Sequence, residues 1–249
     1  VTQKIIDAMF EKKDDESVPK NIFDVPYFKE QLDTMGMIPC GYHRYYYREQ
    51  EMLNHLIEEY NGIGTRAEQV KETEARLFEL YKDPNLNYKP EELSKRGGAH
   101  YSDAACETIV SIYANKNTHI VLSTKNNGAV PDLPADCVVE VSAHVGSAGA
   151  LPIAFGELPP AERGWLQCMK NMELCVCEAA VTGNYGLALE AFTLNPQITA
   201  GADAKRILDE LLIAHKKYLP QFAEKIAELE KEGVTIKDDK ARALTEQGF

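Results

Sequence analysis

The feature that most constrains the fold is a change of hydrophobic period in the middle of the chain. Two β-branched runs, "THIVLSTKNNG" and "DCVVEVSAHVG", are separated by the turn signals Asn127-Gly128 and Pro134. Such runs between turn residues predict two β-strands, and the "ALPIAFG" segment that follows predicts a third, short one. Because the sequence on both sides reads as helix, we expect an α+β fold that is mostly helical with a small central sheet.

The helical segments carry recognisable boundary signals. Residues 42–60 have apolar side chains at spacings of three and four, which predicts one helix. Thr65, followed three residues later by Glu68, has the pattern of a capping box at the start of the next helix. "SDAACETIVSIYANK" is apolar enough to predict a buried helix, and the C-terminal third predicts helices broken at Gly183 and Pro196. No linker interrupts these segments, so we expect residues 1–249 to form a single domain.

Charge and cysteine usage exclude several classes of protein. The chain has 27 basic and 39 acidic residues, a net charge of −12, which disfavours nucleic acid and anionic membrane surfaces as partners. It contains no apolar run of about 18 residues, the length that a transmembrane helix needs. Its six cysteines lie mostly in apolar patterns, which favours buried thiols in a reducing compartment over disulfides. We therefore expect a cytoplasmic protein.

The segment "IPCGYHRYYYREQ" is the first candidate for chemistry. Cys40 and His43 have the spacing of half a zinc site, but no second pair matches them, so we favour a buried cysteine beside a polar histidine and assign no metal ligand. Arg44 and Tyr46 open a predicted helix, where a neighbouring guanidinium would favour an ionised phenol acting as a general base. The alternative is plain aromatic packing, although tyrosine is an uncommon choice for a core because its hydroxyl needs a partner.

Three further segments carry weaker signals. Arg66 lies in the first turn of a predicted helix, where a cation and free backbone N–H groups can together bind an anion, unless it is an ordinary surface arginine. "SKRGGAHYSD" indicates either a phosphate loop or lid, or a simple lead into a capped helix. Asn126 and Asn127 are first a turn signal and second a pair of sugar-binding amides. No G-x-G-x-x-G follows a strand, so the chain carries no dinucleotide-binding fingerprint.

Several of these motifs, in this order, resemble glycoside hydrolase family 4. The segments are "IPCGYHRYYY", "TRAEQV", "KRGGAHYSDAACETI", "NNGAVPDLPADCVVEV" and "VCEAAVTGNYGLALEAFTLNP", which extend from about Ile38 to Leu194. The resemblance is to the C-terminal part of the family, whose fold is like the C-terminal domain of lactate dehydrogenase, and within the family to the 6-phospho-β-glucosidases. It implies hydrolysis of a phosphorylated disaccharide or glucoside, with NAD and a divalent metal, usually Mn, as cofactors.

The resemblance also implies roles for individual residues. In the family mechanism NAD takes a hydride from C3 of the sugar, the metal polarises the ketone, and a tyrosine removes the acidified C2 proton before the aglycone leaves. That tyrosine matches Tyr46, and its partner arginine, two residues earlier, matches Arg44. A substrate-binding arginine twenty residues after the base matches Arg66. Asn126 and Asn127 join these as candidate substrate-binding residues. Members of the family assemble as homo-oligomers.

The chain departs from the family pattern in what it lacks. The NAD-binding N-terminal half, the metal-binding Cys and His and the acidic proton donor of the family would all lie before Val1. We therefore expect this chain to be the substrate half of the enzyme and to be inactive alone. Two alternatives stay open: another specificity in the family, a 6-phospho-α-glucoside or an α-galactoside, or a truncated binding or assembly domain without catalytic activity.

Overall fold

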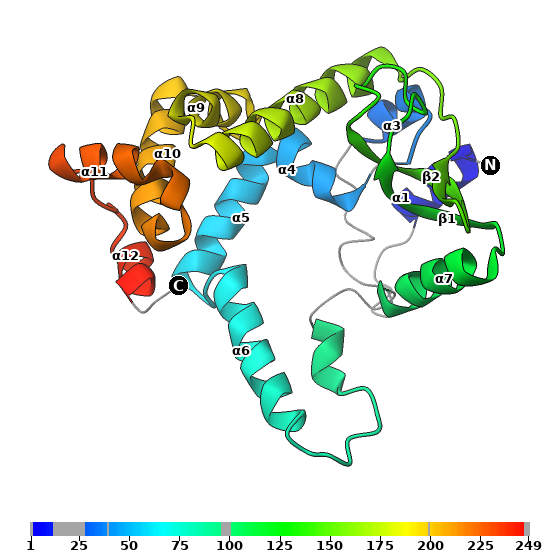
Figure 1. Ribbon diagram of the computed structural model, residues 1–249, viewed down its shortest axis with the longest axis horizontal. Coiled ribbons are helices and arrows are strands. Elements are labelled where there is room, and N and C mark those ends of the chain that lie inside the picture. Colours follow the sequence, from blue (N-terminus) through cyan, green and yellow to red (C-terminus); the bar gives the residue numbers. More distant parts are fainter. Residues whose placement is uncertain (1, 12–27, 39, 96–100, 199, 247–249) are drawn as a thin grey trace. The chain divides into compact units, whose positions relative to one another are not determined.

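The structure, a computed structural model, describes residues 2–11, 28–38, 40–95, 101–198 and 200–246 (Figure 1). The chain divides into two compact units, an N-terminal unit of Val1–Glu157 and a C-terminal unit of Leu158–Phe249. Each unit is described by itself. The expectation of a single domain over residues 1–249 stays a prediction, and residues 96–100 of the "KRGGAH" segment lie outside the described residues.

A small core joins the first helices of the N-terminal unit. α1 (Thr2–Glu11) and α3 (Lys29–Met35) pack through Ile6 and Leu32, whose side chains are fully buried. The Lys29 ammonium lies 2.9 Å from the carboxylate of Asp7 on α1 and 3.1 Å from that of Asp33 on its own helix. These pairs are exposed, so they orient the helices more than they stabilise them. α3 ends at Gly36, whose left-handed backbone at φ 63° forms the C-cap.

The helix predicted over residues 42–60 is interrupted in the structure. Its elements are a 3-10 turn, η1 (Gly41–His43), a single helical turn, α4 (Arg44–Tyr47), and the longer α5 (Glu49–Asn61). Arg48 separates α4 from α5 because its backbone, at φ −127° and ψ 41°, is not helical. The prediction of one continuous helix was therefore wrong. The spacing of apolar residues at three and four positions is the same on both sides of a one-residue break, so it does not reveal the break.

The next helix begins where its capping signal predicts. α6 (Arg66–Leu80) has Thr65 as its N-cap: the Thr65 hydroxyl accepts from the Glu68 amide at 3.3 Å, and the Glu68 carboxylate accepts from the Thr65 amide at 2.7 Å. The capping box is confirmed. A short 3-10 segment, η2 (Glu91–Lys95), follows and contacts α6.

The predicted strands form a three-stranded antiparallel sheet in the order β1-β2-β3. β1 (Thr118–Lys125) pairs with β2 (Val138–Gly146), which pairs with β3 (Gly149–Pro152). Alternate residues of β2 are buried, from Val139 to Val145, so one face of the sheet is packed and the other is exposed. α7 (Tyr101–Ala114) contacts β1 and β2, and Ser111 of this helix donates a hydrogen bond of 2.7 Å to Thr118.

The exposure of side chains in α7 and of three cysteines contradicts the prediction that both would be buried. Of the residues of α7 only Ser111 is buried, and Tyr113 is 93% exposed, so the prediction of a buried helix was wrong. All six cysteines are free thiols, as expected, but Cys40, Cys106 and Cys177 are exposed. An apolar pattern on all sides of a helix shows that it can be buried; it does not say which neighbours cover it.

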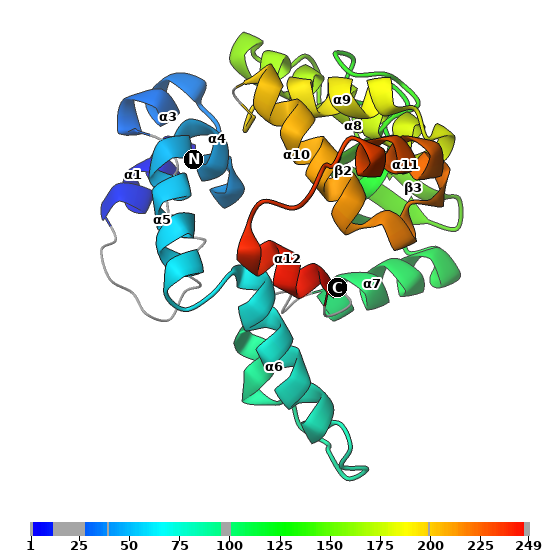
Figure 2. The same cartoon turned by 90° about the vertical axis from the view of Figure 1, so that its left-hand side faces the viewer.

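The C-terminal unit is helical and has the larger core. Its elements are α8 (Pro160–Thr182), α9 (Tyr185–Leu194), α10 (Gly201–Ala214), the 3-10 turns η3 (Lys216–Tyr218) and η4 (Pro220–Phe222), α11 (Ala223–Lys231) and α12 (Asp239–Glu246). α10 contacts both α9 and α11 (Figure 2). The helix breaks predicted at Gly183 and around Pro196 are confirmed.

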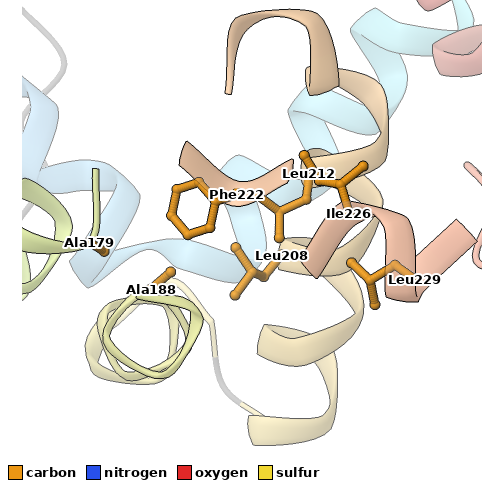
Figure 3. Close-up of a cluster of buried hydrophobic side chains, with 7 residues drawn as sticks. All are labelled: Ala179, Ala188, Leu208, Leu212, Phe222, Ile226 and Leu229. Carbon is orange, nitrogen blue, oxygen red and sulfur yellow. The ribbon is translucent and has the colours of Figure 1, made fainter. Parts of the chain in front are cut away.

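Side chains from five elements meet in this core (Figure 3). Leu208 and Leu212 of α10 pack with Phe222 of η4 and with residues of α11, all at most 5% exposed. The small side chains of Ala179 and Ala188 belong to the same cluster, so α8 and α9 can approach closely. At the edge of the core, Tyr185, Lys205 and Asp209 interact: the phenol donates to the carboxylate at 2.6 Å, and the ammonium pairs with its other oxygen.

The fold class is thus the one predicted, an α+β fold that is mostly helical with a small sheet. Within the described ranges, none of the helices combines the length and the apolar character that crossing a bilayer requires.

Candidate functional site

The turn that carries Tyr46 is short and locally defined. Cys40, with extended backbone at φ −72° and ψ 138°, precedes the 3-10 turn, and α4 closes with the Arg48 amide donating to the Arg44 carbonyl at 2.9 Å. Arg48 then leaves the helical conformation, and its Nε donates to the Glu51 carboxylate at 2.8 Å in the first turn of α5. The helical backbone therefore runs without a break from the 3-10 turn through α4 and ends at Arg48, so the orientation of this short segment depends on what its side chains contact.

The three consecutive tyrosines have different environments. Tyr47 packs against the small core formed by Ile6 and Leu32 and so fastens α4 to α1 and α3. Tyr45 lies under the Arg44 guanidinium, whose central carbon is 5.4 Å from the ring centroid, a cation–π distance. Tyr46 lies between them and is partly exposed. Since consecutive residues of a helix point about 100° apart, the packing of Tyr47 directs Tyr46 to another side of the turn.

The Arg44 guanidinium stacks on Tyr45, whereas the sequence suggested that it lies beside the Tyr46 phenol. Residues two apart on a helix do not face each other, so the helix by itself does not place this guanidinium against the Tyr46 hydroxyl. The stacking partner of Arg44 is the adjacent Tyr45, a role that the sequence reasoning missed. The signal that could have found it is the adjacency of an arginine and a tyrosine, a pair that often stacks.

Cys40 and His43, the first pair to suggest a metal, lie beside this turn. Cys40 is exposed, and the His43 ring is tilted against the Tyr47 ring with 6.4 Å between centroids. Partial burial lowers the pKa of His43 from its usual value because the charged imidazolium loses hydration. In the described part of the chain, no three His, Cys, Asp or Glu residues gather where they could hold a metal ion.

Arg66 is the first residue of α6, and its side chain is exposed. The proposed contribution of free backbone N–H groups is weaker than the sequence suggests, because Thr65 already accepts from the Glu68 amide. The Glu68 carboxylate also lies at this helix end, where it offsets the positive end of the helix dipole. If an anion binds here, the guanidinium is the group that binds it.

The two asparagines after β1 have opposite environments. Asn126 is fully buried: its amide nitrogen lies 2.9–3.1 Å from the carbonyls of Val130, Leu133 and Pro134, and its oxygen accepts from the Val130 amide at 2.8 Å. Asn127 is exposed and has a positive φ of 48°, as the turn requires. Asn126 thus holds its own loop in shape, and Asn127 presents an accessible amide.

The predicted site residues therefore occupy three segments of the N-terminal unit. Arg44 and Tyr46 share one helical turn, Arg66 opens α6, and the Asn126-Asn127 pair follows β1. The turn at Arg44–Tyr47 and the preceding His43 offer a phenol, a stacked guanidinium and an imidazole. Such a set can move a proton and bind an anion.

Comparison with known proteins places these segments in context. Residues 1–198 match the model of the family 4 glycosyl hydrolase C-terminal domain. The chain is 49% identical over 226 residues to a probable 6-phospho-beta-glucosidase of Bacillus subtilis, which covers 91% of this chain and 51% of that protein. It is 39% identical over 213 residues to a 6-phospho-beta-glucosidase of Escherichia coli, covering 85% of this chain and 47% of that protein.

A solved structure agrees with the sequence comparison. The 6-phospho-beta glucosidase of Thermotoga maritima, solved with manganese, NAD+ and glucose-6-phosphate, superimposes with a TM-score of 0.73 and 30% identity, over 88% of this chain and 49% of that one. The chain spans about half the length of the curated relatives that it matches.

Proposed function

Because the chain belongs to the family 4 glycosyl hydrolases and matches their C-terminal domain, we propose that it supplies the substrate half of a 6-phospho-β-glucosidase. The names of its relatives in Bacillus subtilis and Escherichia coli support this activity. The glucose-6-phosphate, NAD+ and manganese bound to the Thermotoga maritima enzyme support the substrate class and the cofactors.

The cofactor sites are assigned to the other half of the enzyme. The sequence has no dinucleotide fingerprint, and the residues that the structure describes contain no cluster of three metal-binding side chains. The sequence therefore does not fit NAD, and the described residues do not fit the metal. When bound in the whole enzyme, NAD and the divalent metal supply oxidation at C3 of the sugar and polarisation of the resulting ketone. The contribution of this chain is to bind the substrate and to move one proton.

Tyr46 is the residue that we propose removes the C2 proton. The observation that carries this assignment is that the other two tyrosines of α4 have structural contacts. Tyr47 packs against the small core, and the Tyr45 ring stacks with the Arg44 guanidinium. Tyr46 is partly exposed between them, and it is the tyrosine that matches the base of the family. The packing of Tyr47 on the small core fixes the orientation of the turn that carries Tyr46.

The phosphate and the ring hydroxyls of the substrate need donors. Arg44 and Arg66 supply guanidinium groups, which bind phosphate in a bidentate manner. Asn127 supplies an exposed amide, and Asn126 acts by holding the loop that presents it. Assembly into homo-oligomers, a cytoplasmic location and a requirement for the second half for turnover are further parts of this proposal.

A Tyr46→Phe substitution tests the assignment in the full-length enzyme. We expect turnover of a 6-phospho-β-glucoside, and exchange of the C2 proton with D2O followed by NMR, to fall at least about 100-fold, the usual contribution of a general base. The matched control is Tyr45→Phe, which removes a neighbouring hydroxyl but keeps the ring under Arg44, and we expect it to change turnover less than about threefold. Far-UV circular dichroism verifies that both variants fold.

The outcomes separate the competing functions. If Tyr46→Phe retains C2 exchange, Tyr46 is not the base. If the unsubstituted full-length enzyme turns over an α-linked phosphoglucoside instead, the specificity is wrong but the role of Tyr46 is still testable. If it turns over neither of these substrates nor an α-galactoside, the reading as a binding or assembly domain is favoured.

A further inference from the structure

Two histidines face each other on the open side of the sheet. His119 of β1 and His144 of β2 are direct register partners, with ring centroids 5.7 Å apart and ring planes at 37°. The neighbours of His144 in the chain, Ala143 and Val145, are 0% exposed. Because side chains alternate across a strand, His144 must point to the opposite, exposed face, and the register places His119 beside it. Both histidines are exposed.

The spacing of the two rings is close to that of a chelate. A Zn–N bond is about 2.1 Å long, so two imidazoles bound tetrahedrally to one ion have centroids roughly 5 Å apart. The pair in the structure needs to close by less than about 1 Å, which small rotations of exposed side chains provide. Its backbone is held by antiparallel pairing that continues from Thr118 to Lys125. The two ligands are therefore preorganised, which lowers the entropic cost of binding.

The neighbours of the pair on this face of the sheet are not metal ligands. The adjacent row of the sheet on this face holds Val121 and Ser142, and Leu151 of β3 pairs with His144. No third His, Cys, Asp or Glu of the described ranges completes a cluster here. We propose that His119 and His144 chelate a late first-row divalent ion, Zn²⁺, Ni²⁺ or Cu²⁺, with water as the other ligands. Imidazole suits these ions, and the net charge of −12 favours any cation.

This site is distinct from the metal of the proposed reaction. Mn²⁺ binds nitrogen ligands most weakly of the divalent series and prefers oxygen ligands, so the pair discriminates against the ion found in the Thermotoga maritima relative. The inference rests on the sheet register and the spacing of the two rings, and it does not depend on the proposed glycosidase activity.

Calorimetric titration of the 249-residue chain with ZnCl2, in a buffer that does not bind metals, tests the proposal. We expect His119→Gln and His144→Gln each to weaken Zn²⁺ binding at least about tenfold, because either change leaves one imidazole. The double variant should bind no more weakly than the single ones, since a chelate needs both ligands. The matched control is His215→Gln, an exposed histidine at the end of α10, which should leave affinity unchanged. MnCl2 in excess should not compete.

A second measurement does not depend on variants. In NMR spectra of the unsubstituted chain, substoichiometric Zn²⁺ should shift the imidazole signals of His119 and His144 together, and those of His215 should not move. The proposal is overturned if each single variant keeps its affinity within about twofold, if His215→Gln weakens binding as much as the others, or if the two imidazoles do not shift together.

Discussion

Gly183 offers a sharp test of the packing in the C-terminal unit. It ends α8 with a left-handed backbone, φ 72° and ψ 16°, and its amide donates to the Ala179 carbonyl at 2.8 Å. A Cβ built at this position would lie 2.0 Å from the Gln221 carbonyl oxygen and 2.8 Å from its carbon. Both atoms are backbone, so they cannot turn aside as a side chain would. Gly183→Ala must therefore strain its own backbone and also displace η4, which contributes Phe222 to the core.

Two other glycines of the same unit separate these effects. Gly233 has a similar φ of 79° but nothing within 4 Å of its Cβ position, so Gly233→Ala should cost only the left-handed strain, about 1–2 kcal/mol. Gly164 lies inside α8 with open space around it, and alanine there should stabilise by about 1 kcal/mol. Gly183→Ala adds an overpacking term of about 1–3 kcal/mol to the strain, for a total of about 2–5 kcal/mol.

Urea unfolding followed by tryptophan fluorescence measures the difference. The one tryptophan of the chain, Trp165, lies in α8 and so reports the C-terminal unit. With a urea slope of about 1–3 kcal/mol per molar, Gly183→Ala should lower the midpoint by roughly 1–2 M, clearly more than Gly233→Ala. If the two variants lose the same stability, the close approach of Gly183 to Gln221 is not a feature of the folded protein and the reasoning fails.

Two further predictions concern the buried polar side chains of Asn126 and Asp209. Asn126→Asp should destabilise the 126–137 loop by about 3 kcal/mol or more, because the new carboxylate faces carbonyls and cannot donate to them. The rate of amide hydrogen exchange in this loop should rise. Asn127→Asp, at the exposed neighbour, should leave that rate nearly unchanged. Burial, then the hydrogen bond to Asp209, raises the pKa of Tyr185, and the hydrogen bond to Asp209 raises the pKa of Lys205. Both pKa values are higher in the folded than in the unfolded protein, so the stability that these groups contribute is present in full below about pH 10 and is lost as the pH rises through the folded-state pKa values. The urea midpoint should therefore fall in this pH range. A midpoint that falls as steeply in Asp209→Asn would contradict the assignment.

Local signals predicted most of the secondary structure. The strands of the sheet follow from β-branched runs between turn residues, and the start of α6 follows from Thr65 and Glu68, because each depends on residues that are close in sequence. The candidate base, Tyr46, was found through a resemblance of motifs, which are also local. The break at Arg48 was missed because one non-helical residue barely disturbs a period of 3.6.

The sequence by itself determined the types and order of most elements, the breaks at Gly183 and Pro196 and the family, because these depend on the conformational preferences and identities of neighbouring residues. Only the tertiary structure decided which polar side chains are free to act. It buried Asn126 under carbonyls four to eight residues away, placed Tyr47 against Ile6, and set His119 opposite His144. The contacts of Asn126 depend on how its loop closes, and the other two depend on which distant segments meet and in which register. A one-residue shift in the pairing of β1 with β2 would separate the two histidines.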